Sequence, residues 1–217
     1  MKRKKLTASM IALVMSVSLP MTTYAANWYL EDGSVTVNAD NSGQTVTQGS
    51  TSTPDEAPVI TQRNSSAETS STITINASEN ATANVTISDV NINTSDAAVS
   101  TNGKGNVNIE LDGINTLKSG REHAGLEKSK DGKLTITDEN GNGKLIATGG
   151  EYGAGIGGGS KGNGSNITIT GGEVTATGGT NGAGIGGGLQ KNGEKIIVSG
   201  DATIKVQGGP TDTWDGA

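Results

Sequence analysis

The chain has 217 residues, of which only 2% are aromatic, and it contains neither phenylalanine nor cysteine. An ordinary compact core needs more bulky apolar side chains than this composition supplies, and no disulfide can replace them. Lysine and arginine number 16 against 22 aspartates and glutamates, for a net charge of −6. Such a surface repels nucleic acids and anionic lipids, so we expect no nucleic-acid partner.

Residues 1–26 have the pattern of a secretory signal peptide. Residues 1–5 are basic, residues 6–19 are apolar, and small residues offer a cleavage site after Ala25 or Ala26. The apolar stretch is short for a membrane span and no cysteine follows it, so we expect a secreted or cell-surface protein without membrane insertion. Cleavage removes four cations and leaves 12 cations against 22 acids, a net charge of −10.

From residue 35 onward, apolar and polar residues alternate, as in SVTVNA, STITINA and NVNIELDG. A period of two, bounded by Gly, Asn, Asp or Ser, is typical of half-buried strands. A Gly-rich polar chain can also be disordered, but here the few Ile, Val and Leu residues fall at regular places. We predict that residues 27–106 form the less regular turns of a solenoid. Strands at 35–37, 45–47 and 59–60 would form the earliest turn, and strands at 73–75, 85–87 and 98–99 the next.

Residues 107–209 repeat more regularly. One set of strands starts at Val107, Leu134, Ile167 and Ile196, separated by 27, 33 and 29 residues. A second set follows at 115–117, 145–147, 174–176 and 204–206, and a third at 123–127, 153–159 and 182–188. Three short strands per repeat predict an all-β, single-stranded parallel β-helix, a three-sided solenoid of about five or six turns whose stacked turns bury a narrow core.

The motif GAGIGGG occurs twice, 29 residues apart, and is predicted to form one side of each of two successive turns. Ala154, Ile156, Ala183 and Ile185 would point inward, and the glycines would let the turns approach closely and leave an outer strip almost free of side chains. The first copy also fits GxGxxG, but a turn and a strand follow it where a dinucleotide site needs a helix. The GAGIGGG segments do not fit a calcium-binding nonapeptide repeat or a silk-like tract either.

Residues 210–217 are predicted to form a C-terminal tail. The ends of a parallel solenoid expose strand edges that must be covered. We expect Trp28 and Trp214 to cover the two ends. The alternatives are an end-to-end or surface-protein partner, or a chain that is a fragment of a larger surface protein.

Several segments of the repeat region resemble a known family. They are LDGINTLKSG, HAGLE, GKLTIT, LIATGGEYGAGIGGG and NITITGGEVTATGGTNGAGIGGG. They resemble secreted carbohydrate-binding-domain proteins of clostridia and related Gram-positive bacteria, closely over residues 107–209 and more loosely over 28–106. The resemblance implies a right-handed β-helix similar to that of pectate lyases, without catalysis, with bound calcium and with members that bind polysaccharide. It carries no functional residue onto a position of this chain.

The residues give little support for catalysis. His123 is the only histidine and no serine or cysteine motif accompanies it, so we expect it at the surface or at a corner of the coil. A lyase would need a carboxylate cluster for calcium beside an arginine, and the mature chain has only Arg63 and Arg121. Arg121 and Asp112 fall within one turn, but nothing marks them as a cleft. We expect no enzyme.

A metal site is the more open alternative. Asp138, Glu139 and Asn140 form the densest cluster of acids and amides, in the link TDENGNG between two strands. Calcium takes several oxygen ligands of these kinds, so these residues are the candidate calcium site. A solvated acidic turn explains the same residues, because Asp and Asn favour turns for backbone reasons.

The candidate carbohydrate-binding residues are Tyr152, Glu151, Glu173, Thr175 and Thr177. Tyr152 is the only aromatic residue within the repeats, and sugars commonly stack on aromatic rings. Outward rows of threonine suit a repetitive surface, although threonine is also simply a good exposed strand residue. We predict noncatalytic binding of an extracellular polysaccharide, with calcium as the candidate cofactor. The alternatives are a structural spacer or adhesin stalk and, third, a polysaccharide lyase.

Overall fold

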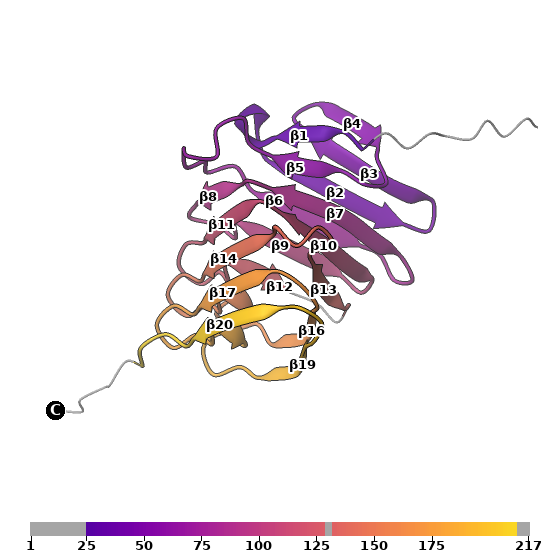
Figure 1. Cartoon of the computed structure of the whole chain (residues 1–217). Helices are drawn as coiled ribbons and strands as arrows, with labels where there is room; N and C mark the ends of the chain where they lie inside the picture. The colour runs from indigo at the N-terminus through magenta and orange to yellow at the C-terminus, as the bar shows by residue number, and fades with distance from the viewer. Residues whose placement is uncertain (1–24, 129–131, 212–217) are drawn as a thin grey trace, which may run out of the picture.

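The computed structural model describes residues 25–128 and 132–211, so almost all of the predicted signal peptide, and Trp214, lie outside the described residues. The chain winds into a solenoid of about six turns built from three sheets (Figure 1). The predicted parallel β-helix is therefore confirmed. No helix in these two ranges is long and apolar enough to cross a membrane.

Each full turn contributes one strand to sheet B, then one to sheet A and one to sheet C. Sheet A contains β1 (Asn27–Tyr29), β5 (Val59–Thr61), β7 (Thr82–Ser88), β10 (Asn106–Asp112), β13 (Leu134–Thr137), β16 (Gly164–Ile169) and β19 (Gly193–Val198). Sheet B contains β4 (Thr51–Pro54), β3 (Gly43–Gln48), β2 (Val35–Asp40), β6 (Ile73–Ala77), β9 (Val99–Gly103), β12 (Leu126–Lys128), β15 (Ile156–Gly157) and β18 (Ile185–Gly186). Sheet C contains β8 (Asn91–Asn93), β11 (Ile114–Lys118), β14 (Lys144–Thr148), β17 (Glu173–Thr177) and β20 (Thr203–Gln207). One 3-10 helix, η1 (Leu30–Asp32), follows β1.

The strand register follows the repeats found in the sequence. Val107 pairs with Leu134, Leu134 with Ile167, and Ile167 with Ile196, all in parallel ladders of sheet A. Alternate residues of each strand point inward, and the inward aliphatic side chains of the middle turns are at most 3% exposed. A continuous column of Ile, Leu, Val and Ala thus forms the core, because each turn covers the inner face of the one before it.

The glycine-rich sides hold successive turns close together. A Cβ atom on Gly150 would lie 1.8 Å from the carbonyl oxygen of Gly120, and one on Gly179 would lie 1.8 Å from that of Gly150. The predicted inward positions of Ala154 and Ile156 are confirmed, since both are fully buried. The predicted exposed strip is wrong: the motif glycines are covered by neighbouring turns and by their own links. These buried glycines are Gly153, Gly155, Gly157 and Gly158.

The prediction for the earliest turn is also wrong for one of its three sides. Residues 45–47 lie in β3, which pairs antiparallel with β2, and β4 pairs antiparallel with β3. The strands at 35–37 and 59–60 do belong to the coil, as parts of β2 and β5, which pair in parallel with β6 and β7. Two-residue links at 41–42 and 49–50 reverse the chain, so this segment is an antiparallel hairpin extension at the N-terminal end of sheet B.

The N-terminal end of the core is covered by polar and aromatic side chains. Trp28 is 8% exposed, and its indole N–H donates to the Asp55 carboxylate over 2.9 Å. Gln44, on β3, is 2% exposed and bonds through its side chain to the Asp55 carbonyl oxygen and to both backbone groups of Asn84. The expectation that Trp28 covers this end is confirmed.

The C-terminal end is built differently. Val198 and Val206 are in register with Ile169 and Ala176, which are fully buried. Nevertheless Val198 is 49% exposed and Val206 is 50% exposed. They are exposed because β18, β19 and β20 are the last strands of their sheets and no further described turn covers them.

Candidate functional site

The link between β13 and β14 forms a wall between two grooves on the outside of the solenoid. One, the corner groove, has a volume of about 590 Å³ and lies between the link and the start of sheet C. The other, the sheet A groove, has a volume of about 680 Å³ and lies over the outer face of β7, β10 and β13. Glu139 lines both grooves, so ligands in the two would be neighbours.

The corner groove brings the candidate calcium residues together with one candidate carbohydrate residue. Asp138, Glu139 and Asn140 line it, and so does Glu173. The Glu173 carboxylate is 2.8 Å from the Lys144 ammonium. With Asp201 also in the lining, four acids face one lysine, so the groove is acidic.

Asp138 organises its own loop. Its carboxylate accepts the backbone N–H groups of Gly141, Asn142 and Gly143 at 2.8, 3.2 and 3.0 Å. Gly141 has φ +71°, a left-handed conformation that glycine adopts without strain. Both Asp138 oxygens are thus engaged by the backbone, which is the turn chemistry that the sequence also suggested. Within residues 25–128 and 132–211, no three or more His, Cys, Asp or Glu side chains are placed to hold a metal ion together.

Half of the ten residues that line the sheet A groove carry uncharged hydrogen-bonding side chains, and these come from three successive turns. The register aligns Asn84 with Asn108 and Asn108 with Thr135, and in the next row Thr86 with Glu110 and Glu110 with Thr137. The full lining is Ala57, Asn84, Val85, Thr86, Asn108, Glu110, Lys133, Thr135, Thr137 and Glu139. Two acids and one lysine leave this groove close to neutral, and none of its lining residues is aromatic.

Hydrogen bonds between turns fix the polar side chains of the sheet A groove. The Asn108 amide donates to the Asn84 amide oxygen over 2.9 Å. The Glu110 carboxylate accepts the backbone N–H of Glu139 at 2.6 Å and the hydroxyl of Thr137. These bonds hold the side chains in place before any ligand arrives, which lowers the entropy cost of binding.

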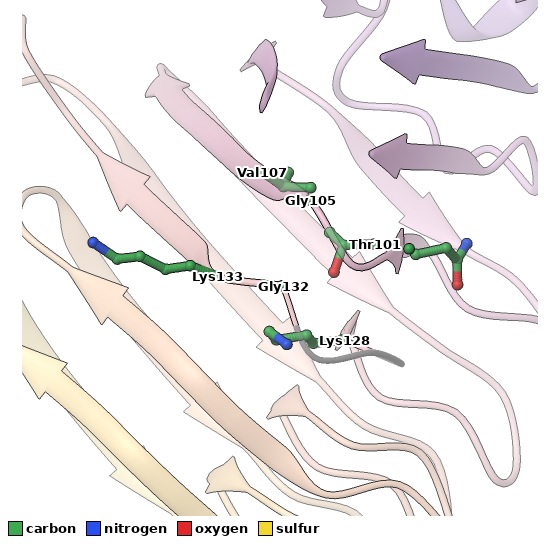
Figure 2. A pocket seen from close by; sticks show the side chains of 8 residues that line it. Thr101, Gly105, Val107, Lys128, Gly132 and Lys133 are labelled. Atoms are coloured by element: carbon green, nitrogen blue, oxygen red, sulfur yellow. The ribbon is translucent and has the colours of Figure 1, made fainter. Parts of the chain in front are cut away.

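Lys133 supplies the single cation of the sheet A groove. Figure 2 shows its side chain extending away from a small pocket at the corner between sheets B and A, where Thr101 and Lys128 lie. That pocket has a volume of only about 10 Å³, enough for one water molecule. This small pocket is therefore a packing feature. Lys133 lines both the small pocket and the sheet A groove.

The other predicted carbohydrate residues lie elsewhere. Glu151 and Tyr152 follow β14 at the corner between sheets C and B, at the opposite end of sheet C from Glu173. There the Arg121 guanidinium is 3.2 Å from the Glu151 carboxylate and 5.4 Å from the Tyr152 ring centre. Thr175 and Thr177 point outward along β17, and neither lines the corner groove. Of the five predicted residues, Glu173 alone lines one of the two grooves.

Among the residues considered for catalysis, Asp112 lies apart from Arg121 and His123. Asp112, at the end of β10, accepts bonds from Ser88 and Asn142. Arg121 lies beyond the other end of β11 and pairs with Glu151. His123 sits at the corner before β12, where its Nδ1 is 3.0 Å from the Glu127 carboxylate. The expected corner position of His123 is confirmed, and the three residues make no common cleft.

Sequence reasoning missed the N-terminal half of the sheet A groove. The outward rows at Thr135, Thr137 and Thr168 were visible in the repeats, but Asn84, Asn108 and Glu110 occupy the same rows one and two turns earlier. The signal was the alternation in NVTIS and NVNIELD, whose outward-facing residues include Asn, Thr and Glu.

Comparison of the chain with protein-family models, curated proteins and solved structures gives no match.

Proposed function

We propose that the protein binds an extended, neutral extracellular polysaccharide in the sheet A groove and does not cleave it. The observation that supports this proposal is the row of amide and hydroxyl side chains on three stacked turns, fixed by hydrogen bonds between the turns. Such groups recur about every 4.8 Å along the solenoid, so a polymer of identical units lying along the axis meets equivalent partners repeatedly.

The chemistry of the groove favours a neutral polymer. Sugar hydroxyls both donate and accept hydrogen bonds, as do Asn84, Asn108 and the threonines. Glu110 and Glu139 would repel a polymer that carries a carboxylate on every unit, and Lys133 offsets only one of them. Because no aromatic ring lines the groove, affinity would come from many weak hydrogen bonds and depend on polymer length.

The test is retention of the mature chain on insoluble polysaccharides and affinity electrophoresis in soluble neutral and acidic ones. Each is run with calcium and with a chelator, because the acidic corner groove adjoins the sheet A groove. The double variant Asn84→Ala with Asn108→Ala removes two hydrogen-bonding side chains from the groove. At about 0.5–1.5 kcal/mol each, and with 1.4 kcal/mol per factor of ten, we expect affinity to fall about tenfold.

A matched control is available on another face. Asn38 and Asn76 form the same amide pair, at 2.8 Å, on the outside of sheet B, so Asn38→Ala with Asn76→Ala should leave binding unchanged. Equal losses in both double variants would reject the groove as the site. No retention on any polymer, with calcium or without it, would reject carbohydrate binding and favour the rigid spacer instead.

A further inference from the structure

Within residues 25–128 and 132–211, nothing covers the cross-section of the core at the last turn. Val198 and Val206 are about half exposed, and Ile196 and Ile204 are only partly buried, whereas the residues aligned with them one turn earlier are fully buried. Around this apolar centre run the outer edges of β18, β19 and β20, which pair with no further described strand and whose backbone groups point along the axis. Open parallel edges around an apolar centre are a template for pairing with another chain.

The charge of the last turn differs from that of the rest of the molecule. Residues 185–207 contain three lysines and two acids, a net charge of +1, whereas residues 27–184 contain nine cations and 18 acids, a net charge of −9. Two copies that approach side by side therefore repel each other, but two copies that meet at their last turns do so through nearly neutral surfaces.

We propose that the C-terminal end of the solenoid binds the C-terminal end of a second copy. Head-to-tail stacking is blocked, because Trp28, Gln44 and the antiparallel strands β3 and β4 cover the N-terminal end.

A two-fold axis perpendicular to the solenoid satisfies this contact. An axis through the middle of β19 and the opposite corner sets β19 antiparallel to its own copy and places β20 against β18 of the partner. A two-fold contact is closed, so it yields a dimer and not a fibre. One coil cross-section is small beside the roughly 1,200–2,000 Å² of a stable interface, so we expect the dimer to form reversibly as concentration rises.

The first test is light scattering and sedimentation of the mature chain over a range of concentrations. We expect a monomer–dimer equilibrium. Lys195→Glu with Lys205→Glu changes the charge of the last turn from +1 to −3 and should weaken the dimer at least tenfold. The control, Lys104→Glu with Lys118→Glu, makes the same change on earlier turns and should alter the dimerisation constant less than twofold. A monomer at all concentrations overturns the proposal, and so does equal weakening by both variants.

The second test uses the absence of native cysteine. Val206→Cys places a thiol near the proposed axis, and Ser50→Cys places one at the N-terminal end as a control. With a short bismaleimide, Val206→Cys should cross-link to dimers and Ser50→Cys should not; equal rates overturn the proposal. Deletion of residues 212–217 should leave the dimer intact. A chain that dimerises only after this deletion has its own tail at the end, which also overturns the proposal.

Discussion

The two ends of the solenoid solve the same physical problem in different ways. At the N-terminal end, Trp28, Gln44 and Asp55 are 8, 2 and 3% exposed and satisfy one another and the backbone. At the C-terminal end, Val198 and Val206 keep the phase of the core but are half exposed. A middle turn needs only aliphatic residues in its core, because the turns on either side cover them. An end of the solenoid needs side chains that cover the core, and within the described part of the chain only the N-terminal end has them.

The sharpest way to test this contrast is to crowd an interior turn. An alanine at Gly179 would set its Cβ 1.8 Å from the Gly150 carbonyl oxygen, a backbone atom that cannot move without parting two turns. We expect Gly179→Ala to reduce the free energy of unfolding by about 3 kcal/mol, the upper part of the range for overpacking. At Gly208 the nearest atom is 3.8 Å away, so Gly208→Ala should change stability by less than about 0.5 kcal/mol.

These values would be measured by urea unfolding followed by far-ultraviolet circular dichroism. Equal effects of the two glycine substitutions would contradict the close stacking of the interior turns.

The same side-chain deletion made in two turns should give two different costs. Val174 is fully buried under the last turn, whereas Val198 is half exposed in it. Val174→Ala removes two buried methyl groups and leaves a cavity, which costs about 2.5 kcal/mol. Val198→Ala should cost about 1 kcal/mol or less. If dimerisation covers the C-terminal end, the cost of Val198→Ala should rise with protein concentration, and that of Val174→Ala should not.

Removing the polar cap should loosen one end only. Asp55 accepts hydrogen bonds from the Trp28 indole and from the backbone of Ala26 and Ala57. Asp55→Ala leaves these donors unsatisfied in a buried place, at a cost of about 2 kcal/mol. Asp138→Ala is the control, because it also removes three hydrogen bonds but from a more exposed loop, and it should cost less. Hydrogen exchange should quicken in β1 and β5 after Asp55→Ala and stay unchanged in β20; a uniform increase would contradict a local cap.

The fold was readable from sequence because each turn repeats the demands of the last. Alternation marked the strands, and the spacings of 27, 33 and 29 residues between Val107, Leu134, Ile167 and Ile196 are the register spacings of sheet A. Alternation does not encode strand direction, so residues 45–47 looked like a coil side although they lie in an antiparallel hairpin. Glycine has no side chain whose polarity reveals its environment, so the burial of Gly155 could not be inferred.

The candidate site was less readable, because grooves depend on the height and direction of links. The sequence singled out Asp138 and Glu173, and the structure places both in the corner groove. It gave no measure of distance along sheet C, so Tyr152 and Glu173 were grouped although Glu173 begins β17 and Tyr152 lies past the opposite end of that sheet. Asn84 and Asn108 were not singled out, because only the register shows that they form a ladder.

The smallest expected effect concerns an ionic contact at the closed end. Arg63 donates to both carboxylate oxygens of Asp32, at 2.9 and 2.6 Å, and its guanidinium lies 4.1 Å from the Tyr29 ring centre. The hydrogen bond from Arg63 holds the pKa of Asp32 below its usual value of 3.8. A lowered pKa means that the contact stabilises the fold above about pH 4 and that this contribution is lost as the pH falls through the lowered pKa. Both side chains are exposed, so the effect is small and screened by salt.

Asp32→Asn should therefore lower the unfolding midpoint slightly at pH 6 and not at pH 2, with the difference shrinking in about 1 M salt. Arg63→Gln also removes the contact with Tyr29 and should cost more at both pH values. Hydrogen exchange locates the effect: it should increase near η1 and residues 63–64, whose backbone N–H groups bond to Glu31. A pH dependence that is the same with and without the Asp32 carboxylate would show that this contact does not help to close the N-terminal end.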